Sequence, residues 1–272
     1  MQFEQPFLKK QTLMPTDTLR YVCVFHLFNY DWLVMNHTLE ACNILSECET
    51  SLATILKRHV IVKEQNIQIG KHVQAHFFSN TITLLTNGNT ATDCAAIVSC
   101  AADLMGECIR KQILVSAYIH NGQFHLNEQT QSIVGKPYIK AKIMAEKTHF
   151  SCILCDRLVE QNIKDFRQFN KDDLLLKKMG ECLLINWEVS YVECEFFGKE
   201  YEEQWVVDWP RYNLDVFEQI KDYSLDDFYN PFAPIYGPFD SLSNQQQRQF
   251  RLSLSFLNHC LKECVKRTNS TL

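Results

Sequence analysis

The sequence of 272 residues contains no apolar run near the roughly 20 residues that cross a bilayer. Its first residues include an early acid and no apolar core, unlike a secretory signal. Lys and Arg total 27 against 32 Asp and Glu, and the basic pairs are scattered. The net charge of −5 argues against a protein that depends on neutralising nucleic-acid phosphates. We therefore expect a cytoplasmic protein with no membrane segment and no nucleic-acid partner.

The sequence also lacks a second pair of zinc-ligand residues. Its one CxxC motif, Cys152–Cys155, encloses Ile153 and Leu154. A structural zinc site needs another ligand pair at a suitable spacing, so the motif favours a core strand, with a metal or redox site as the alternative. The 12 cysteines are scattered through apolar patterns, which is typical of buried free thiols in a reducing compartment.

What is present is an ordinary globular composition, with 46% hydrophobic and 22% charged residues. Residues 1–20 are polar, include two prolines and predict an N-terminal arm. Strand and helix patterns fill residues 21–165. The composition changes after about residue 165 without a flexible linker. We expect a first domain over 21–165 and a C-terminal extension, 166–272, docked on it.

Periodicity predicts the order strand, helix, hairpin, helix, strand, helix, strand in the first domain. This mixed order, with one hairpin inside it, indicates an α+β sheet with helices packed on one face. Asn121-Gly122 is expected to turn the chain after the strand that precedes it. The predicted elements are a strand at 21–28, a helix at 38–60, a hairpin of 72–78 and 81–86, a helix from Thr90 or Thr92 to 112, a strand at 113–120, a helix from 135 and a strand at 152–155. In the extension, 181–187, 189–197 and 204–207 predict strands, and about 242–267 predicts a final helix.

Four segments in this order carry a resemblance to a known family. The last of them resembles a Gly-x-x-x-x-x-Ala-x-x-x-x-Glu helix, and Val206-Val-Asp-Trp-Pro210 adds weaker similarity in the extension. The four segments are Val24-Phe-His-Leu-Phe-Asn-Tyr30, His76-Phe-Phe-Ser-Asn-Thr-Ile82, Ile113-Leu-Val-Ser-Ala-Tyr-Ile-His-Asn-Gly122 and Val134-Gly-Lys-Pro-Tyr-Ile-Lys-Ala-Lys-Ile-Met-Ala-Glu146. Together they resemble the catalytic domain of class III nucleotide cyclases, in particular the short stand-alone bacterial cyclases that include the pyrimidine cyclases of anti-phage signalling.

The resemblance implies a ferredoxin-like class III cyclase sheet with helices on one face, plus a C-terminal α/β extension. It also implies a dimer, because cyclase sites form between two subunits. In that family, an aspartate in the first strand and another at the hairpin hold two divalent ions, and an arginine on a later strand contacts phosphate. The ions activate the ribose 3′-hydroxyl and neutralise charge as it attacks the α-phosphate.

This sequence departs from the family at all three positions. His26 and Asn80 stand where the aspartates are expected, and Ser116 stands where the arginine is often found. Imidazole and amide groups are poor ligands for Mg²⁺, and serine cannot give the charge-assisted contacts of a guanidinium. Asn29-Tyr30 replaces the Gly-Phe of the first motif. Asp31 follows closely and could supply a carboxylate only if the turn were remodelled.

Other interpretations of these residues remain open. His26 is expected to be a hydrogen-bonded core histidine, with a zinc ligand shared with His76 or His120 as the alternative. Asn80 is expected to take a positive φ in the hairpin turn. The cations Arg110, Lys111 and Lys136 are expected on a solvated face, with a pocket for an anionic nucleotide as the alternative.

We therefore predict a catalytically inactive cyclase-like protein that acts as a nucleotide-binding or regulatory module, with bacterial defence signalling as one setting. Expected partners are a second copy of the chain, an active cyclase or an effector. No cofactor is expected. The alternative is a divergent active cyclase that uses Mg²⁺ or Mn²⁺ to make a cyclic mononucleotide from a nucleoside triphosphate.

Overall fold

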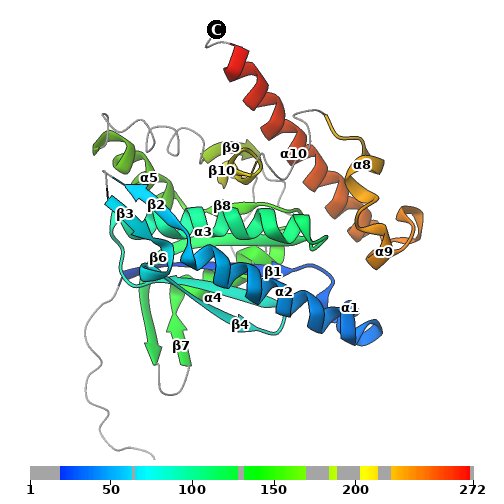
Figure 1. The fold of residues 1–272 in the computed structure, drawn as a ribbon, viewed down its shortest axis with the longest axis horizontal. Coiled ribbons are helices and arrows are strands. Elements are labelled where there is room, and N and C mark those ends of the chain that lie inside the picture. Colours follow the sequence, from blue (N-terminus) through cyan, green and yellow to red (C-terminus); the bar gives the residue numbers. More distant parts are fainter. Residues whose placement is uncertain are drawn as a thin grey trace, which may run out of the picture.

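The computed structural model describes residues 19–62, 65–127, 132–169, 184–188, 203–213 and 222–269. The expected arm therefore lies almost entirely outside the described residues, and the strand predicted at 189–197 lies outside them as well. Within these ranges the fold is a central sheet with helices packed against it (Figure 1). The α+β class predicted from the sequence is confirmed.

The central sheet has the strand order β4-β5-β1-β6-β8-β10-β9, and β7 pairs separately with β6. Neighbouring strands are antiparallel except β6 and β8, which are parallel. A short hairpin of β2 and β3 lies apart from this sheet. The strands are β1 (Leu19–Leu27), β2 (His59–Val62), β3 (Gln65–Gln68), β4 (Val73–Phe78), β5 (Thr81–Thr86), β6 (Val115–Asn127), β7 (Ser132–Gly135), β8 (Ile153–Cys155), β9 (Leu184–Glu188) and β10 (Glu203–Val207).

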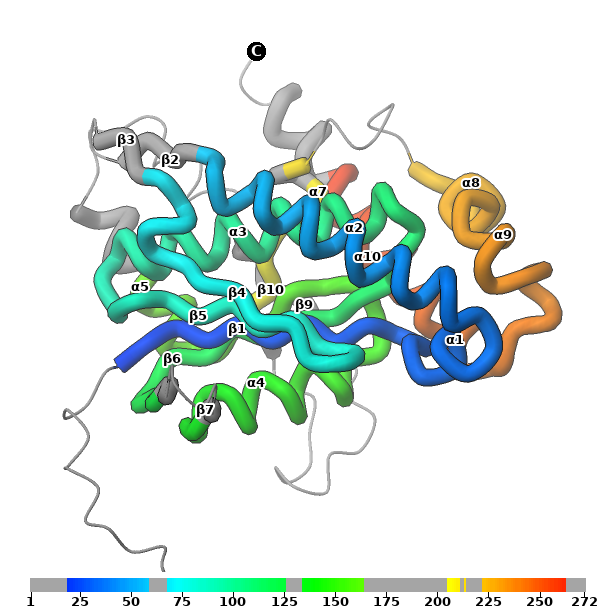
Figure 2. Tube along the Cα trace, turned by 60° about the horizontal axis from the view of Figure 1, so that its bottom comes forward, coloured from blue at the N-terminus to red at the C-terminus, as the bar shows by residue number. Residues whose placement is uncertain are grey.

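Helices cover both faces of the sheet, whereas the sequence predicted one. Figure 2 shows α2 and α3 on one side and α4 on the other. The physical reason is that alternate residues of β1 are buried on both faces, so each face needs its own apolar cover. The helices are α1 (Tyr30–Asn36), α2 (Thr38–Lys57), α3 (Ala91–Arg110), α4 (Lys136–Lys147), α5 (Arg157–Phe169), α7 (Trp209–Tyr212), α8 (Leu225–Tyr229), α9 (Ala233–Tyr236) and α10 (Asn244–Asn269), with 3₁₀ turns at Ile69–Lys71 and Phe239–Ser241.

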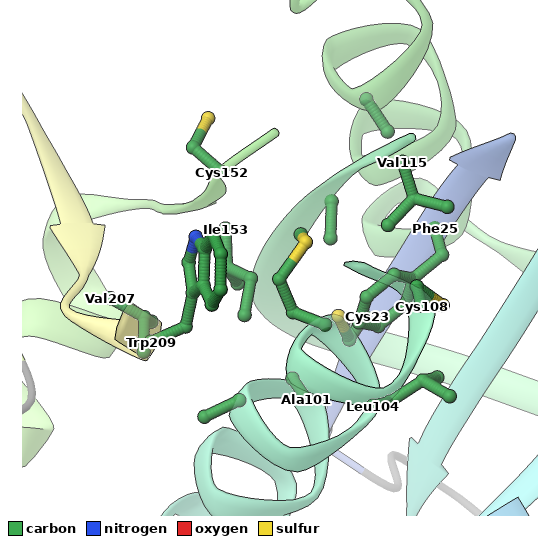
Figure 3. Packing of buried hydrophobic residues seen from close by; sticks show 14 of the residues in the cluster. Cys23, Phe25, Ala101, Leu104, Cys108, Val115, Cys152, Ile153, Val207 and Trp209 are labelled. Atoms are coloured by element: carbon green, nitrogen blue, oxygen red, sulfur yellow. The ribbon is translucent and has the colours of Figure 1, made fainter. Parts of the chain in front are cut away.

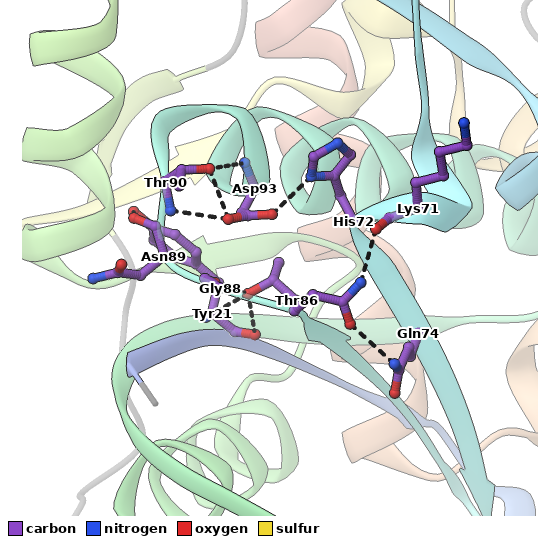
Figure 4. Close-up of polar contacts among 10 residues, drawn as sticks. Tyr21, Lys71, His72, Gln74, Thr86, Gly88, Asn89, Thr90 and Asp93 are labelled. Carbon is purple, nitrogen blue, oxygen red and sulfur yellow. Dashed lines mark hydrogen bonds and ion pairs between the residues drawn. The ribbon is translucent and has the colours of Figure 1, made fainter. Parts of the chain in front are cut away.

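Helix α3 begins at a capping box that the sequence predicted in part. Thr90 is the N-cap, its hydroxyl accepts the Asp93 N–H, and the Asp93 carboxylate accepts the Thr90 N–H. Asp93 also accepts a hydrogen bond from His72, 2.8 Å from its Nδ1, which ties the helix to the residue before β4 (Figure 4). These contacts fix the start of α3 over the sheet.

The core lies mainly between α3 and the sheet. Small and sulfur-containing side chains dominate α3, which lets the helix approach the strands closely (Figure 3). Cys152 and Cys155 are buried free thiols, as expected for a core strand. Trp209, 1% exposed, extends this core into the C-terminal part, and its indole N–H donates to the Ser151 carbonyl at 3.2 Å.

The C-terminal part joins the same sheet and packs on α3. β10 pairs with β8, so the sheet continues into the extension. Asn213 donates hydrogen bonds to the carbonyl oxygens of Ala102 and Trp209, each at 2.9 Å. A β-carbon on Gly106 would lie 2.5 Å from this amide, so glycine allows the close approach. On α10, the Ser253 hydroxyl accepts the Ser151 N–H at 2.8 Å.

A further local expectation was wrong. β6 continues through Asn121 and Gly122 instead of turning, because both pair in register with β1 and the Asn121 N–H donates to Asp156. Thr38 begins α2, and its hydroxyl donates to the Val34 carbonyl of the preceding helix. Across the described ranges, none of the helices combines the length and apolar character needed to span a membrane.

Candidate functional site

The three positions singled out by the family resemblance lie together at one end of neighbouring strands. His26 on β1 pairs with Thr81 on β5 and with Ser116 on β6. Asn80 precedes Thr81, and its carbonyl oxygen accepts the Leu27 N–H at 2.9 Å. Paired residues point to the same face of a sheet, so His26 and Ser116 both point toward α4.

His26 is a partly exposed histidine whose ring faces a polar neighbourhood. Burial lowers the pKa of its imidazole, and the negative charges of Glu146 and Asp31 oppose that effect. Its Nδ1 atom is buried and has no hydrogen-bond partner in the described part of the chain. The ring packs edge-on against Phe28, with centroids 6.0 Å apart. At neutral pH this side chain therefore offers a neutral ring nitrogen and no charge.

The β4–β5 hairpin turn differs from the prediction. Ser79, not Asn80, has the positive φ, at 50°. A positive φ at the first of the two central residues is a feature of type II′ turns, which match the twist of the flanking strands. The Thr81 hydroxyl donates to the Phe78 carbonyl at 2.8 Å and closes the turn. Asn80 therefore does not have the positive φ that the sequence predicted for it.

The turn after β1 contains a left-handed residue that is not glycine. Asn29, in the position of the family glycine, has φ 57° and ψ 17° and precedes α1. Asparagine tolerates this conformation better than most residues. Asp31, the acid considered as a substitute, lies in the first turn of α1 and is exposed.

Ser116 occupies a position with no room for a long side chain. It is fully buried, and its hydroxyl donates to the Ala145 carbonyl of α4 at 2.6 Å. Arginine there would have to displace the helix. Serine in place of the family's arginine therefore allows α4 to pack closely on the sheet.

Packing explains the glycine and the alanine of the motif that contains α4, whereas its glutamate lies on the surface. A β-carbon on Gly135 would lie 2.9 Å from the Gln123 carbonyl oxygen, so the close approach of the end of β7 to β6 requires glycine. Ala141 is fully buried against the sheet, which α4 contacts through β1 and β6. Glu146 is exposed, and its carboxylate lies 3.8 Å from the Lys142 ammonium.

These donors do not fit a pair of hard divalent ions. A neutral imidazole, an amide and a buried hydroxyl supply no negative charge, whereas Mg²⁺ prefers carboxylate oxygens in octahedral geometry. No group of three or more His, Cys, Asp or Glu side chains with metal-binding geometry occurs among the described residues.

The other sequence-predicted groups lie apart from one another. His120 on β6 pairs with Val22 on β1 and contacts Asp156. Burial lowers its pKa to about 4. The three cations considered for a nucleotide pocket do not converge, because Arg110 and Lys111 end α3 while Lys136 begins α4 on the opposite face. Arg110 pairs with Glu107 and Lys111 with Glu47.

Sequence reasoning overlooked His76 and Thr83 as a pair. They face each other across β4 and β5, on the same face as His26. Alternation along the predicted hairpin could have placed them there. Only the structure shows that Nε2 of His76 and the hydroxyl of Thr83 have no hydrogen-bond partner among the described residues.

Comparison with known proteins supports the fold and does not show a function. No known family model matches the sequence, and no curated protein matches it. Among solved structures, the catalytic core of a rhodopsin-guanylyl cyclase with converted specificity, in complex with ATPαS, is 14% identical, with a TM-score of 0.50 over 70% of this chain and 95% of that one. The protein has a cyclase-like fold.

Two further structures are similar at slightly lower scores. The adenylyl cyclase CyaB from P. aeruginosa is 12% identical over 71% of this chain and 94% of its own, with a TM-score of 0.49. The monomeric guanylyl cyclase domain of the RhoGC fusion protein from the aquatic fungus Blastocladiella emersonii is 11% identical over 70% and 95%, with a TM-score of 0.49.

Proposed function

We propose that this protein is a non-catalytic cyclase-like module that binds a nucleotide and regulates a partner. The observation that carries the proposal is the set of side chains at one end of β1, β5 and β6. His26, Asn80 and Ser116 come together there, and none of them is acidic or cationic at neutral pH. The cyclase-like fold supports a nucleotide as the ligand, and the chemistry of these residues argues against turnover.

The energetic argument concerns the charge of the transition state. Cyclisation builds negative charge on the α-phosphate and on the leaving pyrophosphate, and metal ions held by carboxylates normally offset it. Each lost factor of ten in rate corresponds to about 1.36 kcal/mol. Removing the clamp at both carboxylate positions therefore lowers the rate by several orders of magnitude.

The partner part of the proposal is a homodimer, an active cyclase or an effector of a defence system. The exposed side chains of Val134 on β7 and Ile139 on α4 support a protein contact on that side of the sheet. Size-exclusion chromatography with light scattering distinguishes a homodimer from a monomer that needs another partner.

The experiment on activity is incubation with each of the four ribonucleoside triphosphates and Mn²⁺, followed by mass spectrometry for cyclic mononucleotides. We expect no cyclic product and a rise in melting temperature with at least one triphosphate or cyclic mononucleotide. A matched variant, His26→Asp with Asn80→Asp, restores two carboxylates. It is expected to make triphosphate binding more dependent on Mn²⁺.

The second candidate is a divergent active cyclase in which Asp31, in the first turn of the helix that follows β1, supplies a carboxylate in place of His26. A cyclic product that disappears in Asp31→Ala would establish that candidate and overturn the first. Absence of any thermal response to nucleotides would overturn the binding role.

A further inference from the structure

Helix α1 and the start of α2 expose three large apolar side chains in one short stretch of the chain. Trp32 is 41% exposed, Met35 is 82% exposed and Leu39 is 71% exposed. Helix α1 reaches the core through Tyr30 and Leu33, and the three exposed side chains take no part in that packing. Figure 1 shows α1 at the end of α2 that is remote from the β2–β3 hairpin. We call these three exposed side chains the α1–α2 patch.

The α1–α2 patch is held in shape by contacts where the two helices meet. The His37 N–H donates to the Leu33 carbonyl at 2.6 Å, which continues the hydrogen bonding of α1 to the junction. The rings of Trp32 and His37 have centroids 5.3 Å apart. The members of the patch follow one another at spacings of three and four residues, which is the spacing of one side of a helix. The surface is therefore formed before any partner arrives.

The composition of the α1–α2 patch is typical of a binding surface. An apolar side chain gains free energy from burial only when it leaves water, so these three contribute little to folding. Tryptophan supplies a large and rigid contact area, and methionine adapts its shape to different neighbours. Exposed apolar side chains that cluster in this way mark sites of interaction.

The charge around the patch has a single sign. Residues 21–56 contain no Lys or Arg, whereas four acidic residues lie among them. Of these four, only Glu47 pairs with a cation of the described residues, Lys111 on α3. The four exposed acids are Asp31, Glu40, Glu47 and Glu49. The patch is therefore an apolar surface with an acidic border.

This acidic border favours one kind of occupant over others. A second copy of the chain that met the patch across a two-fold axis would bring acids next to acids. The anionic surface of a cytoplasmic membrane would be repelled for the same reason. A protein segment with both apolar and basic side chains complements the patch, and an amphipathic helix presents them at matching spacings.

We propose that the α1–α2 patch binds a basic amphipathic helix of a partner protein. The apolar side of that helix packs on Trp32, Met35 and Leu39, and its Lys or Arg side chains lie near Asp31 and Glu40. The inference rests on the regulatory part of the proposed function, and it names the surface and the chemistry of the contact.

Fluorescence anisotropy with a labelled peptide of Leu and Lys, amphipathic as a helix and about 18 residues long, tests the inference. The same peptide with Glu in place of every Lys is the matched probe. We expect the Lys peptide to bind, with an affinity that falls as salt is raised, and the Glu peptide not to bind. Met35→Lys is expected to fold, because this side chain is 82% exposed, and to weaken binding about tenfold or more.

Two further variants separate the roles of charge and of apolar contact. Asp31→Asn with Glu40→Gln leaves the apolar side chains intact, and it is expected to reduce both the affinity and its salt dependence. Leu158→Lys is the matched control, because Leu158 is a 50% exposed leucine on α5. Figures 1 and 2 show α5 at the opposite end of the molecule from α1. This control is expected to bind the Lys peptide as the wild type does.

Three results would overturn the inference: undiminished binding by Met35→Lys, equal binding of the Lys and Glu peptides, or no peptide binding. Light scattering that shows a wild-type dimer and a Met35→Lys monomer would assign the patch to a second copy and overturn it as well. The thermal response to nucleotides is measured on the same proteins. A nucleotide response without peptide binding overturns this inference alone, and peptide binding without a nucleotide response overturns the nucleotide role alone.

Discussion

The hydroxyl of Ser116 and the carbonyl oxygen of Ala145 are 2.6 Å apart, and this hydrogen bond joins β6 to α4. Ser116 is fully buried under the helix. We predict that Ser116→Arg, which introduces the residue expected from the family, destabilises the fold by about 3 kcal/mol or more. The reason is that an unpaired guanidinium would be buried and α4 displaced. Urea denaturation followed by circular dichroism measures the loss.

Ser116→Ala is the control for that variant. It removes one hydrogen bond without adding volume, so we expect a cost of about 1 kcal/mol. A Ser116→Arg protein as stable as the wild type would contradict the packing argument.

The contact between Gly106 and Asn213 gives a second prediction. Gly106→Ala places a methyl group against the Asn213 amide, so we expect a loss of about 1–3 kcal/mol in stability despite alanine's better helix propensity. The free energy of unfolding in urea measures this loss.

Asn213→Ala separates the clash from other effects of the added methyl group. The double variant Gly106→Ala with Asn213→Ala is expected to lose less than the sum of the two single variants. Strict additivity would mean that the two residues do not interact.

The lowered histidine pKa values give a pH dependence of known sign. Burial lowers the pKa of four of the described histidines in the folded state, so the unfolded chain takes up protons first as the pH falls. Stability is therefore complete above about pH 6.5 and is lost toward pH 4. The four are His26, His76, His120 and His149.

His120 is expected to contribute most to this slope, since its pKa falls from 6.5 to about 4. The contribution of His120 to the free energy of unfolding has an upper limit of about 3 kcal/mol. The carboxylate of Asp156 beside the ring reduces this contribution. Thermal unfolding between pH 4 and 8 measures the slope, and His120→Asn is expected to flatten it. An unchanged slope in this variant would assign the effect to other groups.

Much of this fold was predictable because its strands and helices have clear periodicity. The strand at β1, the hairpin of β4 and β5, the Thr90 cap and the final helix all follow local patterns. Such patterns do not report which face a helix covers. The position of α4 depends on the close approach at Gly135 and on the bond from Ser116 to Ala145, both of which join residues distant in sequence.

The candidate site was predictable in its positions and not in its detail. The family resemblance identified His26, Asn80 and Ser116, and the register brings them together. The positive φ was assigned to Asn80 because asparagine favours it, yet the two-residue turn required it at Ser79. That buried atoms of His76 and Thr83 have no hydrogen-bond partner among the described residues depends on every neighbour in three dimensions, which no sequence pattern reports.

The pairing of β10 with β8 has a practical consequence for anyone who wishes to work with the cyclase-like part alone. A fragment ending after α5 would lack β10 and would leave one edge of β8 with unpaired backbone N–H and C=O groups. The residues of β8 are all apolar. Exposed edges of this kind recruit strands from other molecules and promote aggregation. We expect such a fragment to be poorly soluble, so binding experiments belong on the full chain.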